Sequence, residues 1–396
     1  MMKAKFLAAA LLLSMGLLAA CGAEEKSEES SPEYSVEPSK IETAESSSVV
    51  ESEASSEEAK AEDATITERY EKDGMMQSYL TGEWKPAEVV KRRNMAVMMP
   101  NNKAAMPQYG ISQASIIYEA PVEGRITRLM CFFEDYDELD MVGPVRSSRD
   151  YYVYEAMAYD SIYCNWGLAV PFVAPVINSD RIDNVSQPLT GIEVGAAEAF
   201  FRRERAGYKT EYTGYMDIEG YEKAVTRLGY ETEYRDRFEQ AFTFANDGHR
   251  AEYEDAEDAV LIYPGGQESN KGGFWDARSY FEYNEEDGLY YRYQFGGKHI
   301  DEMNGEQLAV SNVVFKICHG EVHEPTNLDY LAFAVHGEGD AYIFTNGKVI
   351  KGTWERESDF AANMFYDEDG NEIIFNQGKT WICNIWKEYS EYMHYE

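Results

Sequence analysis

The chain has 396 residues, enough for two ordinary domains, and its 72 acidic against 36 basic residues give a net charge of −36 at pH 7. So acidic a surface repels the phosphate backbone of nucleic acids, and we therefore expect no nucleic-acid partner. Cationic partners are compatible with this charge. Alternatively, the acidic residues only keep the protein soluble.

The N-terminus predicts export. Lys3 and Lys5 precede an apolar run that ends at Ala20, as in a secretory signal peptide spanning 1–20. This run is shorter than the roughly 20 apolar residues that a membrane span needs. It closes on LAAC, which resembles the lipobox of bacterial lipoproteins. That resemblance implies that Cys21 is lipidated and becomes the first residue after cleavage; the alternative is an ordinary signal peptide with an incidental cysteine.

The next segment, 21–64, is predicted to be an acidic, disordered tether. From 22 to 63 it holds 14 acidic residues and three lysines, and it has no apolar face at helical spacing. Such a composition cannot bury enough apolar surface to fold. The segment is interpreted as a spacer that holds the folded body away from the membrane.

The first half of the body, 85–235, alternates predicted strands and helices, which favours an α/β arrangement. Asp217 and Gly229 are suited to cap the last of its helices. Between these elements, the Pro- and Asn-containing stretch 167–189 is expected to be a long loop. The predicted strands are 95–99, one that begins with the apolar run 116–118, 126–133 and 161–165, and the predicted helices are 147–158, 195–205 and 217–228.

From about Ala241 the apolar pattern changes to a period of two, which predicts strands. The hairpin around Asn346-Gly347 is the strongest local signal, because this dipeptide is suited to a tight two-residue turn. The second half, 240–396, is therefore predicted to be a mainly antiparallel β domain. The fold class is α+β: an N-terminal α/β-type domain followed by this β-rich domain. The predicted strands are 241–245, 259–263, 280–283, 289–295, 308–318, 331–336, 341–345, 349–354, 372–375 and 380–386.

The stretch from Ile116 to Tyr152 concentrates the polar residues that could bind a ligand. Two guanidinium groups, neighbouring hydroxyls and the start of a helix make a good cradle for an anion. The alternative is an internal network of ion pairs, because buried charges need partners in any fold. The candidate ligand-binding residues are Glu119, Glu123, Arg128, Arg146, Ser147 and Arg149.

Several phrases in the chain resemble the YerB family of bacterial lipoproteins. They cover most of the body: AVMMPNN (96–102), MPQYGISQASIIYEAPVEGRITRL (106–129), GPVRSSRDYY (143–152), SNVVFK (311–316), KGTWER (351–356) and GKTWICNI (378–385). The resemblance implies a two-domain extracytoplasmic lipoprotein without an assigned reaction. Where family members commonly have a histidine before a glycine-rich turn, this chain has Cys164, so a histidine at that place cannot be essential here.

Other motifs give little support for catalysis. The chain contains neither a G-x-S-x-G elbow nor a glycine fingerprint for nucleotides, and we expect no cofactor. An enzyme remains the alternative function: Glu119 and Glu123 could act as the paired carboxylates of a glycan hydrolase if they face one cavity. A scaffold for other envelope proteins is a third possibility, which would need a large exposed apolar patch.

Histidines, cysteines and aromatic residues each have a simple structural interpretation. His319 and His323 would share a metal only if their segment were helical, and Gly320 disfavours a helix, so no metal site is predicted. The cysteines at 131, 164, 318 and 383 lie in apolar runs, where we expect free buried thiols. The dense aromatic residues of the second half are expected to stabilise sheets, although a glycan or peptide platform is the alternative.

Together these features predict a lipid-anchored extracytoplasmic protein that binds a ligand or a partner at the cell envelope. It would face outward from the cell membrane, to which Cys21 attaches it. Another envelope protein or a cell-wall glycan would be the binding partner.

Overall fold

The computed structural model describes residues 64–187, 195–323 and 328–396. The predicted signal peptide, Cys21 and the predicted tether up to residue 63 lie outside these residues. Within them, a mixed eleven-stranded sheet forms the centre of the fold. Its strands are, in their order across the sheet, β12 (Glu257–Asp258), β22 (Lys348–Arg356), β21 (Gly337–Thr345), β18 (Asn312–Cys318), β25 (Thr380–Trp386), β4 (Ile116–Val122), β5 (Ile126–Phe133), β3 (Met95–Asn101), β7 (Ile162–Trp166) and β8 (Asn184–Gln187), with β23 (Met364–Asp367) beside β22.

This sheet joins the two predicted halves. Strand β25 comes from the second half and lies between β18 and β4, parallel to both. Most strand pairs of the second half are antiparallel, so these parallel neighbours depart from its main pattern. The α+β fold class is confirmed, whereas the domain boundaries at 85–235 and 240–396 stay predictions.

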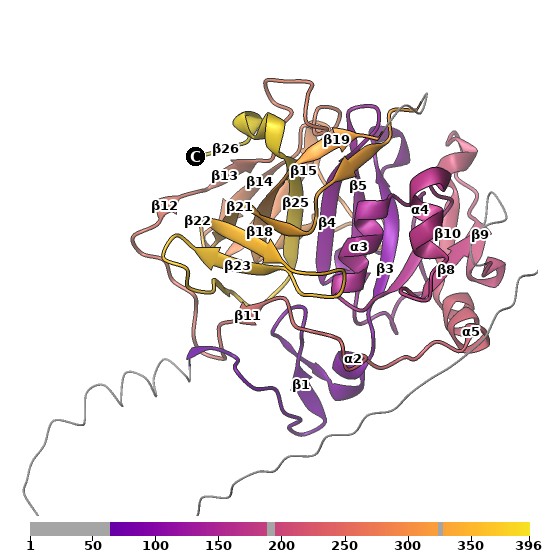
Figure 1. Cartoon of the computed structure of the whole chain (residues 1–396), viewed down its shortest axis with the longest axis horizontal. Coiled ribbons are helices and arrows are strands. Elements are labelled where there is room, and N and C mark those ends of the chain that lie inside the picture. Colours follow the sequence, from indigo (N-terminus) through magenta and orange to yellow (C-terminus); the bar gives the residue numbers. More distant parts are fainter. Residues whose placement is uncertain (1–63, 188–194, 324–327) are drawn as a thin grey trace, which may run out of the picture. The chain divides into compact units, whose positions relative to one another are not determined.

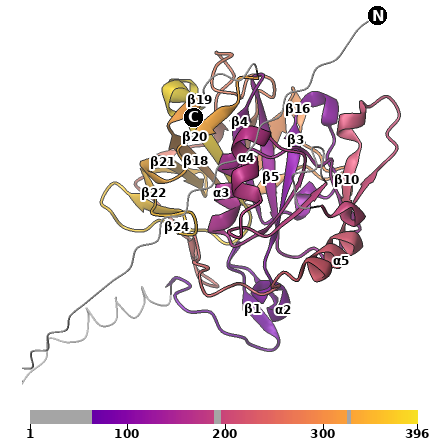
Figure 2. The same cartoon turned by 45° about the vertical axis from the view of Figure 1, so that its right-hand side comes forward.

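Both faces of the central sheet are covered, which is why β3 and β4 are buried along their whole length. Helices α3 (Asp150–Ala158) and α4 (Val170–Ile177) lie over one face of β3 to β5 (Figure 1). Helix α5 (Ile218–Leu228) and strand β10 (Gly214–Asp217) lie on the other side of these strands (Figure 2).

Smaller sheets complete this second layer. In the described residues, a six-stranded sheet contains β16 (Gly297–Lys298), β15 (Leu289–Gln294), β14 (Tyr280–Asn284), β13 (Leu261–Tyr263) and β26 (His394–Tyr395), with β17 (Ala309–Val310) beside β15. A second group contains β6 (Met141–Val142), β10 (Gly214–Asp217) and β9 (Phe200–Arg202).

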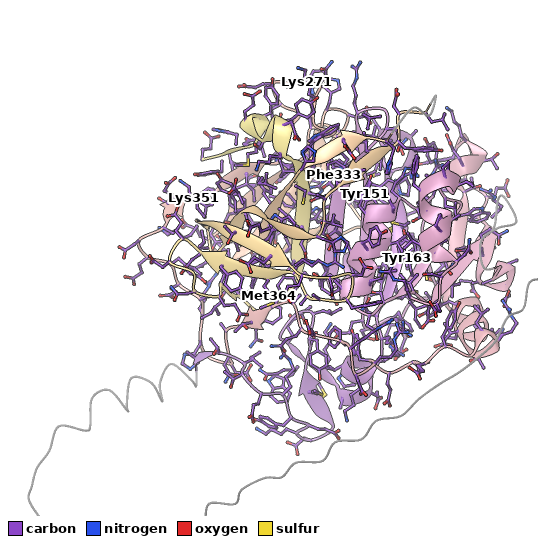
Figure 3. The ribbon with its side chains drawn as sticks, viewed as in Figure 1. Tyr151, Tyr163, Lys271, Phe333, Lys351 and Met364 are labelled. Atoms are coloured by element: carbon purple, nitrogen blue, oxygen red, sulfur yellow. The ribbon has the colours of Figure 1, made fainter. Side chains whose placement is uncertain are left out.

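The remaining elements are short. The paired strands are β1 (Met75–Gln77) with β2 (Trp84–Pro86), β11 (Thr243–Phe244) with β24 (Ile374–Phe375), and β19 (Gly320–Val322) with β20 (Leu331–Phe333). The other helices are α2 (Ala87–Lys91) and the 3-10 helices η1 (Lys103–Ala105), η2 (Ile111–Gln113), η3 (Ala197–Ala199), η4 (Thr210–Tyr212) and η5 (Lys387–Tyr392). Tyr151 of α3 and Phe333 of β20, both labelled in Figure 3, make one contact between the two halves. Their ring centroids are 5.1 Å apart.

Two local predictions, the cap of a helix and a tight turn, are confirmed. The Asp217 carboxylate caps α5 by accepting a hydrogen bond from the Gly220 amide at 2.6 Å, and Gly229 ends this helix in the left-handed conformation. Asn346 and Gly347 form the tight turn between β21 and β22, both with positive φ.

Two predictions about the first half are wrong. The stretch predicted as a loop over 167–189 contains α4 and β8. Pro175 suggested a break, but the apolar side chains of Val173 and Ile177 bury this segment as a helix. The predicted helix 195–205 is instead η3 followed by β9. Phe200 is buried and Phe201 is 38% exposed, because successive side chains of a strand point to opposite faces and this segment pairs with β10.

Candidate functional site

The loop between β6 and α3 carries Arg146 and Ser147 and is held by backbone hydrogen bonds to three strands. The Val145 amide donates to Gly214 of β10 at 2.7 Å, and the Arg146 amide donates to Met98 of β3 at 2.9 Å. The Trp166 amide of β7 donates to the Arg146 carbonyl at 3.1 Å. The two side chains therefore project from a rigid backbone, as a preorganised binding site requires.

A cavity of about 180 Å³ opens beside this loop. Arg146 reaches Glu211 of η4, with 3.2 Å between its Nη1 atom and Oε2 of the carboxylate. The Ser147 hydroxyl donates to the Trp166 carbonyl at 3.2 Å. The lining residues are Val145, Arg146, Ser147, Trp166, Arg202 and Glu211.

Arg202 of β9 completes the cavity from the opposite element. Its guanidinium carbon lies 4.1 Å from the centre of the Trp166 ring, a cation–π arrangement. Gly214 is needed for this packing, because a Cβ atom there would lie 2.5 Å from the indole. In the described residues no carboxylate pairs with Arg202, whose Nη1 atom donates to the Thr210 carbonyl. Stacking on a ring orients its remaining donors for a planar or tetrahedral anion.

Arg128 of β5 lies behind Ser147 and is only 7% exposed. Its Nη1 atom donates to the Ser147 carbonyl at 2.6 Å. Among the described residues no carboxylate lies within ion-pair distance of it. Burial, and then the charges of Arg149 and Arg146, lower the pKa of Arg128 to about 9. A buried guanidinium without an ionised partner is costly, so this group is poised to accept an anion.

Arg149 and Glu123 pair with each other. The Arg149 Nε atom donates to Glu123 Oε1 at 2.8 Å, and its Nη2 atom contacts the second carboxylate oxygen at 2.5 Å. Burial by itself would raise the pKa of Glu123, but the bonds to Arg149 outweigh this effect and the pKa is lowered. For this pair the internal ion-pair alternative describes the observed geometry.

Glu119 is separated from the other candidate residues. Along β4, Ile117 packs in one core cluster while Tyr118 and Ala120 pack in the other. Arg128 stands opposite Ala120 and shares its face. Glu119 therefore faces the opposite side of the sheet from Arg128.

On that side Glu119 is fully buried in its own polar cluster. Its carboxylate accepts hydrogen bonds from Thr127 at 2.6 Å, Asn101 at 3.0 Å and Trp381 at 3.0 Å. It also lies 2.8 Å from the Arg292 guanidinium. The paired-carboxylate hydrolase needs Glu119 and Glu123 in one cavity, and this geometry does not provide it.

We call Arg128, Arg146, Ser147, Arg149 and Arg202 the arginine site. Sequence analysis placed four of these five residues and missed Arg202, together with the cavity residues Trp166 and Glu211. The run of arginines at 202, 203 and 205 was the available signal. It was interpreted as the end of a helix, and only the pairing of β9 with β10 brings Arg202 to the cavity.

The two histidines at H-x-x-x-H spacing point to different partners. His319 pairs with Glu388, whereas His323 lies 3.2 Å from Asp150 and stacks on Phe172 at 3.7 Å. Strand β19 separates them, because its extended backbone carries the two rings apart. No group of three or more metal ligands occurs among the described residues.

All four body cysteines are free and buried, as expected from their apolar surroundings. Burial raises the pKa of the Cys318 thiol to about 12, so this side chain stays protonated and unreactive. Aromatic residues of the second half form a cross-strand ladder in which Tyr280 and Tyr293 stack at 4.8 Å. Because their faces pack on each other, the ladder fits a stabilising role better than a glycan platform.

No helix in the described part of the chain is long and apolar enough to cross a membrane.

Comparisons with known proteins agree on one family. Residues 80–231 match the N-terminal domain, and residues 272–382 the C-terminal domain, of a family described as a protein of unknown function, DUF3048.

Similar proteins come from Bacillus subtilis. A protein of strain 168 whose name describes it as a candidate lipoprotein, YerB, is 26% identical over 304 residues, which are 76% of this chain and 84% of that protein. The crystal structure of YerB from Bacillus subtilis has a similar fold, with a TM-score of 0.63 and 23% identity over 78% of this chain and 96% of that one.

Proposed function

Because the chain belongs to the YerB family, we propose that it is a lipid-anchored extracytoplasmic protein that binds an anionic ligand at the arginine site. The motif ending at Cys21 supports the anchor, and the acidic tether supports a body held away from the membrane surface. The ligand would belong to a cell-wall glycan or to another envelope protein. Nucleic acid is disfavoured by the charge of the chain.

The anchor has a direct test. Replacing Cys21 by Ser should move the protein from the membrane fraction to the soluble or secreted fraction, because the thiol that would carry the lipid is lost. Cell fractionation with immunoblotting measures this. A protein that stays with the membrane after Cys21→Ser would contradict the lipid anchor.

One observation carries the binding proposal: Arg202 lines the cavity beside Arg146 without a carboxylate partner among the described residues, and Arg128 is buried behind Ser147, also without one. Burial first, and then the neighbouring charges of Arg149 and Arg146, lower the pKa of Arg128. In a chain with a net charge of −36, such a concentration of cations needs a reason. An anion bound from outside would supply the missing negative charge.

Crystals soaked in digested cell-wall fragments, sulfate and acetate test the proposal. We expect density between Arg146 and Arg202. Arg146→Ala should abolish binding and change the melting temperature by less than about 2 °C, because its pair with the half-exposed Glu211 contributes little stability. Arg149→Ala is a poor test, since it also breaks the buried pair with Glu123.

The matched control is Arg227→Ala, because Arg227 is also paired with a surface carboxylate, that of Glu198. This variant should bind like the wild-type protein. Density that appears only elsewhere, or an Arg146→Ala protein that binds normally, would contradict the proposal.

A further inference from the structure

We infer that the group bound at the arginine site is a doubly charged tetrahedral oxyanion, of the kind that a phosphate monoester presents. This inference rests on the proposed function and specifies the chemical class of its ligand. It follows from the charge of the site, the directions of its donors and the size of its cavity.

The charges at the site leave two positive charges without partners. Of its four guanidinium groups, those of Arg146 and Arg202 line the cavity, that of Arg128 lies behind Ser147, and that of Arg149 is paired with Glu123. In the described residues their only partners within ion-pair distance are two carboxylates, Glu123 on Arg149 and Glu211 on Arg146. A carboxylate ligand would match only the charge of Arg202 at the cavity, whereas a dianion would also offset the charge of Arg128 buried behind it.

The donors at the cavity come from separate elements. Arg146 projects from the loop after β6, and Arg202 projects from β9 across the cavity. A planar carboxylate is satisfied by one guanidinium fork, whereas a tetrahedral group offers oxygens in several directions. Donors that approach from two elements therefore favour the tetrahedral group.

The cavity admits only the charged end of a ligand. Its volume of about 180 Å³ lies below the roughly 300–1,000 Å³ of pockets that enclose whole small molecules. The side chain of Arg202 and the carboxylate of Glu211 are both substantially exposed, so the mouth is open to solvent. The remainder of the ligand would stay outside, as expected for a phosphate carried on a larger molecule.

Glu211 acts as an internal competitor in this arrangement. Its carboxylate accepts a hydrogen bond from Arg146, which an incoming oxyanion would need. Neutralising Glu211 removes this competing carboxylate and makes the net charge at the cavity more positive by one, while Arg146 stays held by the Glu211 backbone carbonyl at 3.0 Å. Glu211→Gln should therefore strengthen binding, whereas loss of Arg202 should weaken it.

Calorimetric titration of the full-length protein in detergent, at pH 7.5 and low salt, measures the affinity for three small anions. These anions differ in charge and in shape, so the two effects can be told apart. Methyl phosphate is mainly a dianion at this pH, because the second pKa of a phosphate monoester is about 6. Methyl sulfate has a similar shape but one charge, and acetate is planar with one charge. We expect methyl phosphate to bind at least about tenfold more tightly than either monoanion.

The variants locate the effect. Arg202→Ala should weaken methyl phosphate binding at least about tenfold and Glu211→Gln should strengthen it. Arg278→Ala is the matched control and should change nothing, because Arg278 also stacks on a tryptophan, Trp275, at 4.2 Å. If acetate or methyl sulfate binds at Arg202 as tightly as methyl phosphate, the inference is overturned while the proposed function stands. If no anion binds, both are overturned.

Discussion

Glu155→Gln should lower the free energy of unfolding by about 3–5 kcal/mol, because it leaves two buried cations without a carboxylate. Glu155 of α3 lies 2.8 Å from the Lys316 ammonium and 3.4 Å from the Arg356 guanidinium. Its carboxylate also accepts hydrogen bonds from Tyr118 at 2.9 Å and Asn363 at 2.8 Å. All three charged side chains are fully buried, so solvent cannot compensate for the lost charge.

Denaturant unfolding measures this loss, and an exposed pair provides the control. Glu219→Gln on α5 removes a carboxylate whose partner, Lys223, is also exposed, and it should cost less than about 1 kcal/mol. Adding Lys316→Met to Glu155→Gln should restore part of the stability, because it removes one of the stranded cations. Equal losses at Glu155 and Glu219 would contradict a stabilising role for the buried network.

The same network predicts a dependence on pH. Burial by itself would raise the pKa of Glu155, but Lys316 and Arg356 outweigh burial and lower it below its ordinary value. A lowered folded-state pKa means that the contribution is complete above the unfolded-state pKa and is lost as the pH falls through the folded-state pKa. The stability difference between the wild-type protein and Glu155→Gln should therefore shrink in acid.

Glu119→Gln is the second substitution with a large expected effect, again about 3–5 kcal/mol of unfolding free energy. It leaves Arg292 buried without a negative charge, with its guanidinium carbon 4.1 Å from the centre of the Trp381 ring and 4.9 Å from that of Phe281. The rings hold the cation in place, but they do not replace a carboxylate. The role of Glu119 is then structural.

Glu123→Gln is the informative comparison, because both glutamates stand in one sequence stretch. Its partner Arg149 keeps hydrogen-bond acceptors and some contact with solvent, so we expect a loss of only about 1.5–3 kcal/mol. Chemical denaturation of both variants, with Arg292→Met completing a double-mutant cycle for Glu119, measures the difference. A Glu119→Gln protein as stable as the wild type would refute the buried ion pair.

Elements that depend only on neighbouring residues could be predicted from the sequence. The cap at Asp217, the turn at Asn346-Gly347 and the buried strands β3 to β5 depend on residues close together in the chain, so each was predicted. Helix α4 was missed because Pro175 is an unfavourable local signal, which the burial of neighbouring apolar side chains overrides.

The partners of charged side chains could not be predicted from spacing. Glu119 and Glu123 are four residues apart, yet the sheet separates them and supplies Arg292 to Glu119 from a strand far along the chain. Arg202 reaches the cavity only through the pairing of β9 with β10. Which charged side chains meet depends on the register between strands, because a shift of one residue moves every side chain of a strand to the other face of the sheet.

By itself, the sequence determined the family, the α+β class and the elements with strong caps and turns, and it named four of the five residues of the proposed arginine site. Only the tertiary structure decided that the two halves share one sheet, that Glu119 belongs to the core, and that Arg202 and Trp166 complete the cavity. The physical reason is that caps, turns and apolar periods act over a few residues. Ion pairs and cavities instead arise where strands that are distant in the sequence meet. There, the energetic cost of burying a charge determines which side chains become paired.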